Sequence, residues 1–145
     1  MRDLLACCGS RAWARRMAQA RPFDSDAEAL DAGDWIWNGL EESDWREAFG
    51  AHPRIGDRAS GTAAGEQAGT RGAPRAVLEE LGRANQEYEE RFGHIFIVCA
   101  TGKTAEEMLA ICRARLHNDA PTELRAGAEE QRKITRLRLE RYLAT

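Results

Sequence analysis

The chain has 145 residues, of which 43% are hydrophobic and 31% charged, and its formal net charge is −3. This length suits one domain, and the composition is typical of a globular protein. Because charges of both signs are interspersed, the sequence offers no basic face for nucleic acid and no polybasic patch for a membrane. We therefore expect a small-molecule ligand, or a second copy of the chain, as partner.

We expect a cytoplasmic protein. No apolar run approaches the ~20 residues that span a bilayer, and the first residues lack the long apolar stretch of a secretory signal. The cysteines fit neither a zinc site nor a C-x-x-C redox pair, so we predict reduced, buried thiols. They are Cys7, Cys8, Cys99 and Cys112.

Two helices are predicted at the start of the chain. The first covers about residues 3–20 and ends before Pro22, because a residue that precedes proline is pushed out of the α region. Asp24 or Ser25 caps the second, which runs to about Leu40.

A short third helix is predicted from a cap at Ser43 to Gly50. Tryptophans are concentrated in this third of the chain, and a core or a dimer contact explains them more simply than a cofactor site. They are Trp13, Trp35, Trp37 and Trp45.

Residues 51–72 are rich in Gly, Ala, Ser and Thr, so we predict an ordered loop with a helical turn that begins near Ala63. Pro74 suits the first position of a long helix that reaches about Arg91. One face of this helix is marked by Val77, Leu78, Leu81, Asn85 and Tyr88.

Residues 94–100 form a strand-like run, and no second strand is predicted to pair with it. We therefore expect an extended, buried segment between helices, whose backbone groups find partners elsewhere. Such a segment is a candidate wall for a ligand pocket.

Two more helices complete the prediction. Thr104 and Glu107 form a capping box that starts a helix to about His117, and the last helix runs over about residues 122–143. With no internal repeat and no linker, the sequence predicts an all-α protein, a single compact domain over residues 1–145 with about seven to nine helices. The positions of the last helix expected to face inward are Leu124, Ala128, Ile134, Leu137 and Tyr142.

Titratable side chains gather in the loop before the long helix. His52 precedes Pro53, so its backbone is extended, and a histidine can give or take a proton near neutral pH. Glu66 stands at the predicted helical turn, where the dipole of a helix N-terminus favours a carboxylate. For both residues a purely structural role, as a surface or capping side chain, stays open.

Arg115 is the third candidate. Met108, Ile111 and Cys112 form an apolar stripe on their predicted helix, and Arg115 follows on the same stripe. A long charged side chain there either reaches solvent or meets a buried partner. Its planar guanidinium suits a carboxylate or a carbonyl of a heterocycle, so a structural ion pair and a ligand clamp fit the pattern equally.

The sequence does not indicate a metal site or a phosphate-binding loop. His52, His94 and His117 have no partner at the spacing of zinc ligands. Residues 102–104 mimic the end of a phosphate-binding loop, but Ile97 stands where that pattern needs a glycine.

Taken together, these segments resemble the OHCU decarboxylase family, the 2-oxo-4-hydroxy-4-carboxy-5-ureidoimidazoline decarboxylases of urate degradation. The matching segments follow the family's order and cover nearly the whole chain. They are Ala51-His52-Pro53-Arg54-Ile55-Gly56-Asp57, Glu66-Gln67-Ala68-Gly69, Asn85 and Tyr88 with Arg91-Phe92-Gly93, the apolar run that follows, Arg115-Leu116-His117-Asn118-Asp119 with Glu123-Leu124, and Ile134 through Leu139.

The resemblance implies an all-helical fold, a homodimer and a cofactor-free decarboxylation that gives (S)-allantoin. It makes His52 and Glu66 the catalytic residues. It also implies a set of substrate-binding residues, in which the extended segment contributes its backbone. That set is Pro53, Gln67, Arg115, Ile95, Ile97 and Val98.

The chain also departs from the family pattern. Ala63 stands where the family has a serine three residues before the glutamate, the loop before Glu66 is shorter, and the first helix begins late. These departures favour an alternative, a catalytically impaired relative that binds a purine-derived ligand or a pathway partner. Retention of His52, Glu66, Gln67 and Arg115 together favours the enzyme.

Overall fold

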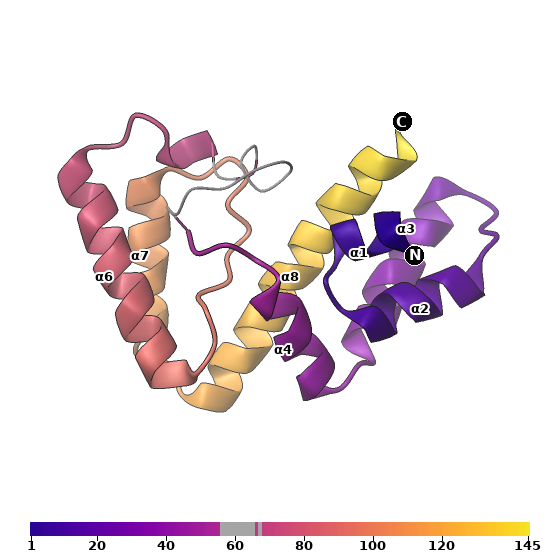
Figure 1. Ribbon diagram of the computed structural model, residues 1–145, viewed down its shortest axis with the longest axis horizontal. Helices are drawn as coiled ribbons and strands as arrows, with labels where there is room; N and C mark the ends of the chain where they lie inside the picture. The colour runs from indigo at the N-terminus through magenta and orange to yellow at the C-terminus, as the bar shows by residue number, and fades with distance from the viewer. Residues whose placement is uncertain (56–65, 67) are drawn as a thin grey trace. The chain divides into compact units, whose positions relative to one another are not determined.

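The computed structural model describes residues 1–55, 66 and 68–145 (Figure 1). These residues form seven α-helices and one 3-10 helix, with no strand among them, which confirms the predicted all-α class. They group into two compact units, one of residues 1–51 with 128–145 and the other within residues 52–127. In this described part of the chain, no helix has both the length and the apolarity that crossing a membrane requires.

The predicted first helix is in fact two helices, α1 (Arg2–Cys7) and α2 (Arg11–Ala20). Cys8 is extended between them, with φ −150° and ψ 124°. The Ser10 side chain then accepts a hydrogen bond from the backbone N–H of Trp13 at 3.2 Å. This local N-cap begins a new helix where the apolar spacing alone predicted a continuous one.

The next two helices are α3 (Asp26–Asn38) and α4 (Glu42–Gly50). Ser25 caps α3 as predicted, because its side chain accepts from the backbone N–H of Glu28 at 3.1 Å. The predicted cap of α4 was wrong, since Glu41 rather than Ser43 holds the N-cap position. The helix still ends at Gly50.

Three of the four tryptophans anchor the unit of residues 1–51 and 128–145. Trp13 donates its indole N–H to the carbonyl of Gly33 at 3.0 Å, and Trp37 donates to the carbonyl of Ala128 at 2.8 Å. Trp45 donates to the carbonyl of Trp37 at 3.0 Å. Trp13 and Trp37 are buried while their polar atoms keep partners, which confirms the predicted core role for these two. Trp45 is half-buried. Trp35 is 80% exposed.

In the unit within residues 52–127, α6 (Arg75–Phe92) and α7 (Ala105–Arg115) lie side by side (Figure 1). The contacts between them run in the same direction along both helices, from Glu80 with Arg113 to Tyr88 with Arg115. The two helices are therefore parallel, and the chain between them has to return along α6. The 18 residues of α6 rise about 27 Å, which explains why the returning segment is extended.

The returning segment begins at Gly93, which ends α6 in the left-handed conformation with φ 78°. Residues 96–100 are buried, and no residue from 95 to 100 belongs to a helix or a strand. The prediction of an extended, buried segment without a strand partner is confirmed. Thr104 and Glu107 form the predicted capping box and start α7.

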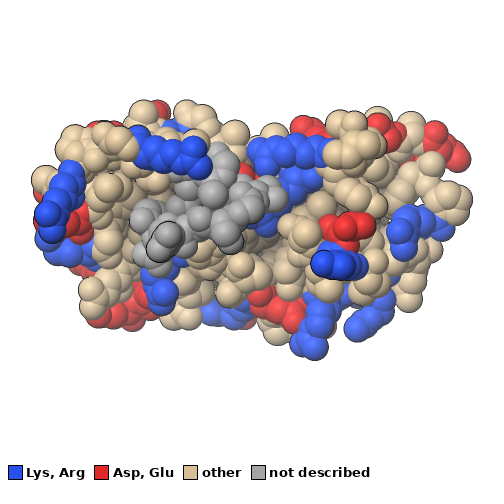
Figure 2. All heavy atoms as spheres, turned by 45° about the horizontal axis from the view of Figure 1, so that its top comes forward, with Lys and Arg blue, Asp and Glu red and all other residues tan. Residues whose placement is uncertain are grey.

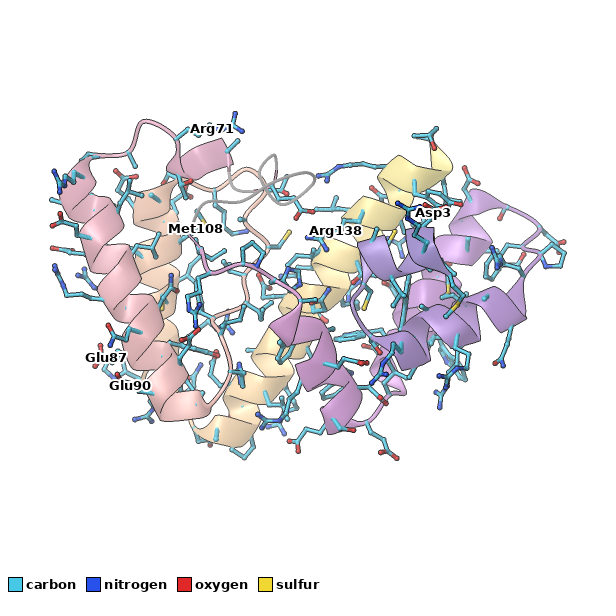
Figure 3. All side chains as sticks on the ribbon, viewed as in Figure 1. Asp3, Arg71, Glu87, Glu90, Met108 and Arg138 are labelled. Atoms are coloured by element: carbon cyan, nitrogen blue, oxygen red, sulfur yellow. The ribbon has the colours of Figure 1, made fainter. Side chains whose placement is uncertain are left out.

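The inner face of α6 follows the predicted pattern. Leu81, Asn85 and Tyr88 are buried, whereas Glu87 and Glu90 lie on the opposite side, away from α7 (Figure 3). The apolar core of this unit joins α6, the extended segment and α7. Its most buried members are Leu81, Tyr88, Phe96, Ala105, Met108 and Cys112.

The last helix, α8 (Ala120–Leu143), begins two residues before the predicted start. Pro121 lies in its first turn, where a missing N–H costs nothing, and the Asp119 side chain accepts from the backbone N–H of Thr122 at 2.8 Å. The inward prediction was wrong for Tyr142, which is 43% exposed. The four predicted buried thiols are confirmed, with the pKa of both Cys8 and Cys112 raised to about 11 by burial.

Candidate functional site

The His52 segment is fastened to α6 by two contacts. The Asn85 side chain donates to the carbonyl of Ile55 at 2.9 Å, and Arg54 pairs with Glu89 at 2.7 Å. Asn85 is only 4% exposed, so this amide–carbonyl contact is shielded from water. His52 itself is half-buried. The contacts thus fix the backbone that follows His52, which limits the directions in which its imidazole can point.

Arg115, at the end of α7, is held by three contacts with described residues. Its Nε lies 2.5 Å from Oε1 of Glu123, and its Nη1 donates to the carbonyl of Ile97 at 2.6 Å. Its Nη2 lies 3.5 Å from the Tyr88 hydroxyl. The side chain is only 11% exposed, so Arg115 meets a buried partner rather than reaching into solvent.

Glu123, in the first turn of α8, is the buried partner. Its side chain is fully buried, and it also accepts from the Tyr88 hydroxyl at 2.6 Å and from the Asn118 side chain at 2.9 Å. Burial raises the pKa of Tyr88, and the hydrogen bond to Glu123 raises it further. The tyrosine therefore remains a neutral donor across the range of pH in which enzymes work.

The sequence left two interpretations of Arg115 open, a structural ion pair and a ligand clamp, and its contacts bear on both. The structural ion pair exists, in the form of the pair with Glu123. A guanidinium has five N–H donors, and the contacts with described residues occupy three of them. The remaining donors leave room for a ligand, so the predicted role in substrate binding stays a prediction.

The extended segment offers backbone rather than side chains. The side chains of Ile97 and Val98 are 2% and 3% exposed, so they pack into the core. The carbonyl of Ile97 already meets Arg115, and the carbonyl of Ile95 lies 3.0 Å from Nδ1 of His94. The structure therefore joins two predicted site elements, Arg115 and the backbone of residues 95–98.

Glu66 is the third predicted element, and it is buried, with 9% of its surface exposed. The 3-10 helix η1 (Ala68–Thr70) follows it. At Gly69 an added Cβ would lie 1.8 Å from the carbonyl oxygen of Lys103, so a glycine is required for this close approach to the loop before α7. The predicted turn near Ala63 and the predicted contact at Gln67 lie outside the described residues.

Replacing Gly69 by alanine tests this packing. We expect Gly69→Ala to lower the free energy of unfolding by about 1–3 kcal/mol, as other overpacking substitutions do, and to reduce activity by displacing the Glu66 segment. Thermal unfolding and steady-state kinetics measure the two effects. Gly82→Ala is the matched control, because an added Cβ there meets nothing within 4 Å. Equal stability of the two variants would contradict the close approach.

Helix α6 links the His52 segment to Arg115. Asn85, which anchors the His52 segment, and Tyr88, which contacts Arg115 and Glu123, are three residues apart and so are neighbours on one helix face. Sequence reasoning marked both as positions of the inner face but did not assign their partners. It also missed the role of Glu123, for which the available signal was an acid directly before the buried Leu124.

Comparisons with known proteins match nearly the whole chain. A family model described as OHCU decarboxylase matches residues 1–140. The uric acid degradation bifunctional protein TTL of Arabidopsis thaliana is 38% identical, over 95% of this chain and 45% of its own length. The 2-oxo-4-hydroxy-4-carboxy-5-ureidoimidazoline decarboxylase of Haloferax volcanii is 29% identical, over 89% of this chain and 80% of its own. This chain therefore spans less than half of the bifunctional relative.

A solved structure shares the fold along the whole chain. It is a crystal structure of OHCU decarboxylase in the presence of (S)-allantoin, with a TM-score of 0.92 and 37% sequence identity. The match covers 100% of this chain and 99% of that one.

Proposed function

This protein belongs to the OHCU decarboxylase family, and we propose that it is a carboxy-lyase that converts 2-oxo-4-hydroxy-4-carboxy-5-ureidoimidazoline to (S)-allantoin. The observation that carries the proposal is the full-length structural match to a family member solved in the presence of (S)-allantoin. The geometry supports it, because the half-buried His52, the buried Glu66 and Arg115 occur in one unit. Contacts with described residues occupy three of the five N–H donors of Arg115.

The substrate needs little help to lose CO2. Its carboxylate and a hydroxyl share one ring carbon, and the neighbouring carbon, which bears the ureido group, is doubly bonded to a ring nitrogen. As the C–CO2 bond breaks, its electron pair forms a C=C bond between the two carbons and the ring nitrogen takes a proton. The hydroxyl then loses its proton to become the carbonyl, and the ureido-bearing carbon is protonated on one face.

Three residues have roles in this proposal. His52 hydrogen-bonds the carboxylate and hydroxyl, holds the C–CO2 bond perpendicular to the ring and accepts the hydroxyl proton. Glu66 accepts hydrogen bonds from N–H groups of the ring or the ureido arm and takes part in the proton relay. Arg115 anchors a carbonyl or the carboxylate and stabilises the negative charge that develops during cleavage.

The remaining substrate contacts are proposed from the resemblance. Pro53 and Gln67 contact the substrate, and the backbone of residues 95–98 lines the pocket. We also propose that the protein is a homodimer and works in the cytoplasm. Charged side chains of both signs lie among each other on the face shown in Figure 2, which favours a small-molecule partner over nucleic acid.

The decarboxylation itself is tested by following the substrate. Urate is oxidised, the first intermediate is hydrolysed by its own hydrolase, and this protein is added while ¹³C NMR records the substrate, CO2 and allantoin. We expect the substrate to disappear far faster than it decays spontaneously, with the carboxyl carbon appearing as CO2 and bicarbonate. An unchanged substrate lifetime would overturn the proposal and favour the impaired relative.

Removal of metal ions tests whether the reaction is free of a metal cofactor. The imine of the substrate already receives the electron pair, so we expect full turnover after prolonged dialysis against EDTA. The chelator is removed before the assay, and the hydrolase and oxidase are left out by adding preformed substrate. A loss of activity that Zn²⁺ or Mg²⁺ restores would show that a metal takes part.

A further inference from the structure

We propose that Glu123 is a positioning residue for the decarboxylation, because it fixes the Arg115 guanidinium in the orientation that meets the substrate. The inference rests on the proposed function, since it assumes that Arg115 contacts the ligand. The sequence marked Glu123 only as part of a family segment. Its contact with Arg115 could not be predicted from its position along the chain.

Glu123 is an expensive residue to bury, which makes its partners informative. A fully buried carboxylate is stable only when it is paired and hydrogen-bonded. Glu123 meets this requirement with donors from three elements: Tyr88 of α6, Arg115 of α7 and Asn118 of the turn before α8. Two of these donors are neutral, so they hold the carboxylate in place, and Arg115 is the cation among its described partners.

Two contacts on different edges determine how the guanidinium lies. The Nε edge faces Glu123 at 2.5 Å, and Nη1 faces the carbonyl of Ile97 at 2.6 Å. Because the group is planar, these contacts fix both its plane and its rotation about the last side-chain bond. The ring of Phe96, whose centroid is 4.8 Å from Cζ, restricts the plane from one side.

In the described part of the chain, N–H donors on the outer edge of the guanidinium remain for a ligand. The Nη2 atom has one long contact, 3.5 Å to the Tyr88 hydroxyl, and Nη1 has a second N–H. The carbonyl of Ile97 alone is a weaker anchor than a carboxylate, because it carries no net charge to attract the guanidinium. Without the Glu123 charge, we expect the long side chain of Arg115 to leave this orientation.

The first experiment is the substitution Glu123→Gln, which keeps the shape and removes the charge. We expect kcat/KM to fall about 10- to 100-fold, with most of the loss in kcat. At 1.4 kcal/mol for each factor of ten, this corresponds to a loss of about 1.4–2.8 kcal/mol of transition-state stabilisation. Glu80→Gln is the matched control, because Glu80 pairs at 2.7 Å with Arg113, which lies on α7 as Arg115 does, but the Glu80 side chain is 42% exposed. We expect that control to stay within twofold of the wild type.

Chemical rescue separates positioning from a merely structural role. Arg115→Ala should lose activity. Millimolar guanidinium chloride should restore part of it, because Glu123 and the carbonyl of Ile97 can accept hydrogen bonds from the free cation. In the double variant Arg115→Ala/Glu123→Gln the rescue should be lost. Sodium chloride at equal concentration is the control for ionic strength, and circular dichroism reports whether each variant is folded.

Each outcome decides the inference. Full activity of Glu123→Gln, or rescue that does not need Glu123, would overturn it while leaving the proposed function intact. Full activity of Arg115→Ala would overturn it too, by removing the assumed contact, whereas an inactive wild type would instead overturn the proposed function. If Glu123→Gln does not fold, Tyr88→Phe replaces it, because it removes a donor to the same carboxylate oxygen. We expect a three- to tenfold lower kcat for Tyr88→Phe, and an unchanged kcat would contradict positioning.

Discussion

His52→Asn is expected to reduce kcat by about 10²–10⁴-fold, the usual contribution of a positioned general acid or base. Asparagine keeps a polar group near the imidazole but cannot transfer a proton at neutral pH. The backbone next to His52 is held independently, through the contact of Ile55 with Asn85. We therefore expect the loss to appear in turnover rather than in the fold, measured by steady-state kinetics on substrate generated in situ.

Two controls accompany this variant. The thermal midpoint should stay within a few degrees of the wild type, because His52 is only half-buried. Calorimetric titration with (S)-allantoin should still detect binding, since Arg115 and its contacts are unaltered. Near-normal turnover would remove His52 from the chemistry and restore its interpretation as a surface or capping residue.

Glu66→Gln is expected to lower turnover roughly 10²-fold or more. The change removes the charge while nearly preserving the shape, and Glu66 is buried, with 9% of its surface exposed. Affinity for (S)-allantoin should also fall, because a hydrogen bond to a charged acceptor contributes about 1.5–3 kcal/mol. Steady-state kinetics and calorimetric titration measure the two losses separately.

Glu87→Gln is the matched control for Glu66→Gln, because Glu87 is an exposed glutamate on the outer side of α6 (Figure 3). Its kinetics and stability should equal those of the wild type. If Glu66→Gln lowers the thermal midpoint but the folded variant turns over normally, Glu66 has the structural role that its sequence left open.

The sequence predicted those parts of the fold that depend on local pattern. The inner face of α6, the capping box at Thr104 and the extended run after Gly93 were all readable, because each depends on residues close together in the chain. Helix boundaries were less secure. A single side-chain cap at Ser10 divided a segment that apolar spacing had joined into one helix.

The sequence named candidate site residues but not the contacts between them. Arg115 could be placed on an apolar stripe, yet its partners lie 8, 18 and 27 residues away on three other segments. No periodicity encodes such tertiary contacts, so the choice between an ion pair and a ligand clamp could not be made from spacing. The contacts explain why both are compatible with one side chain: the inner edge pairs with Glu123 while donors remain on the outer edge.

The proposed reaction ends when the protein directs one proton to one face of the ureido-bearing carbon. Circular dichroism of the coupled reaction tests it most directly, because spontaneous decay of the substrate gives racemic, optically silent allantoin. Addition of the protein should produce rapid growth of the (S)-allantoin signal. A trace that the protein leaves unchanged, while allantoin accumulates at the spontaneous rate, would contradict the account.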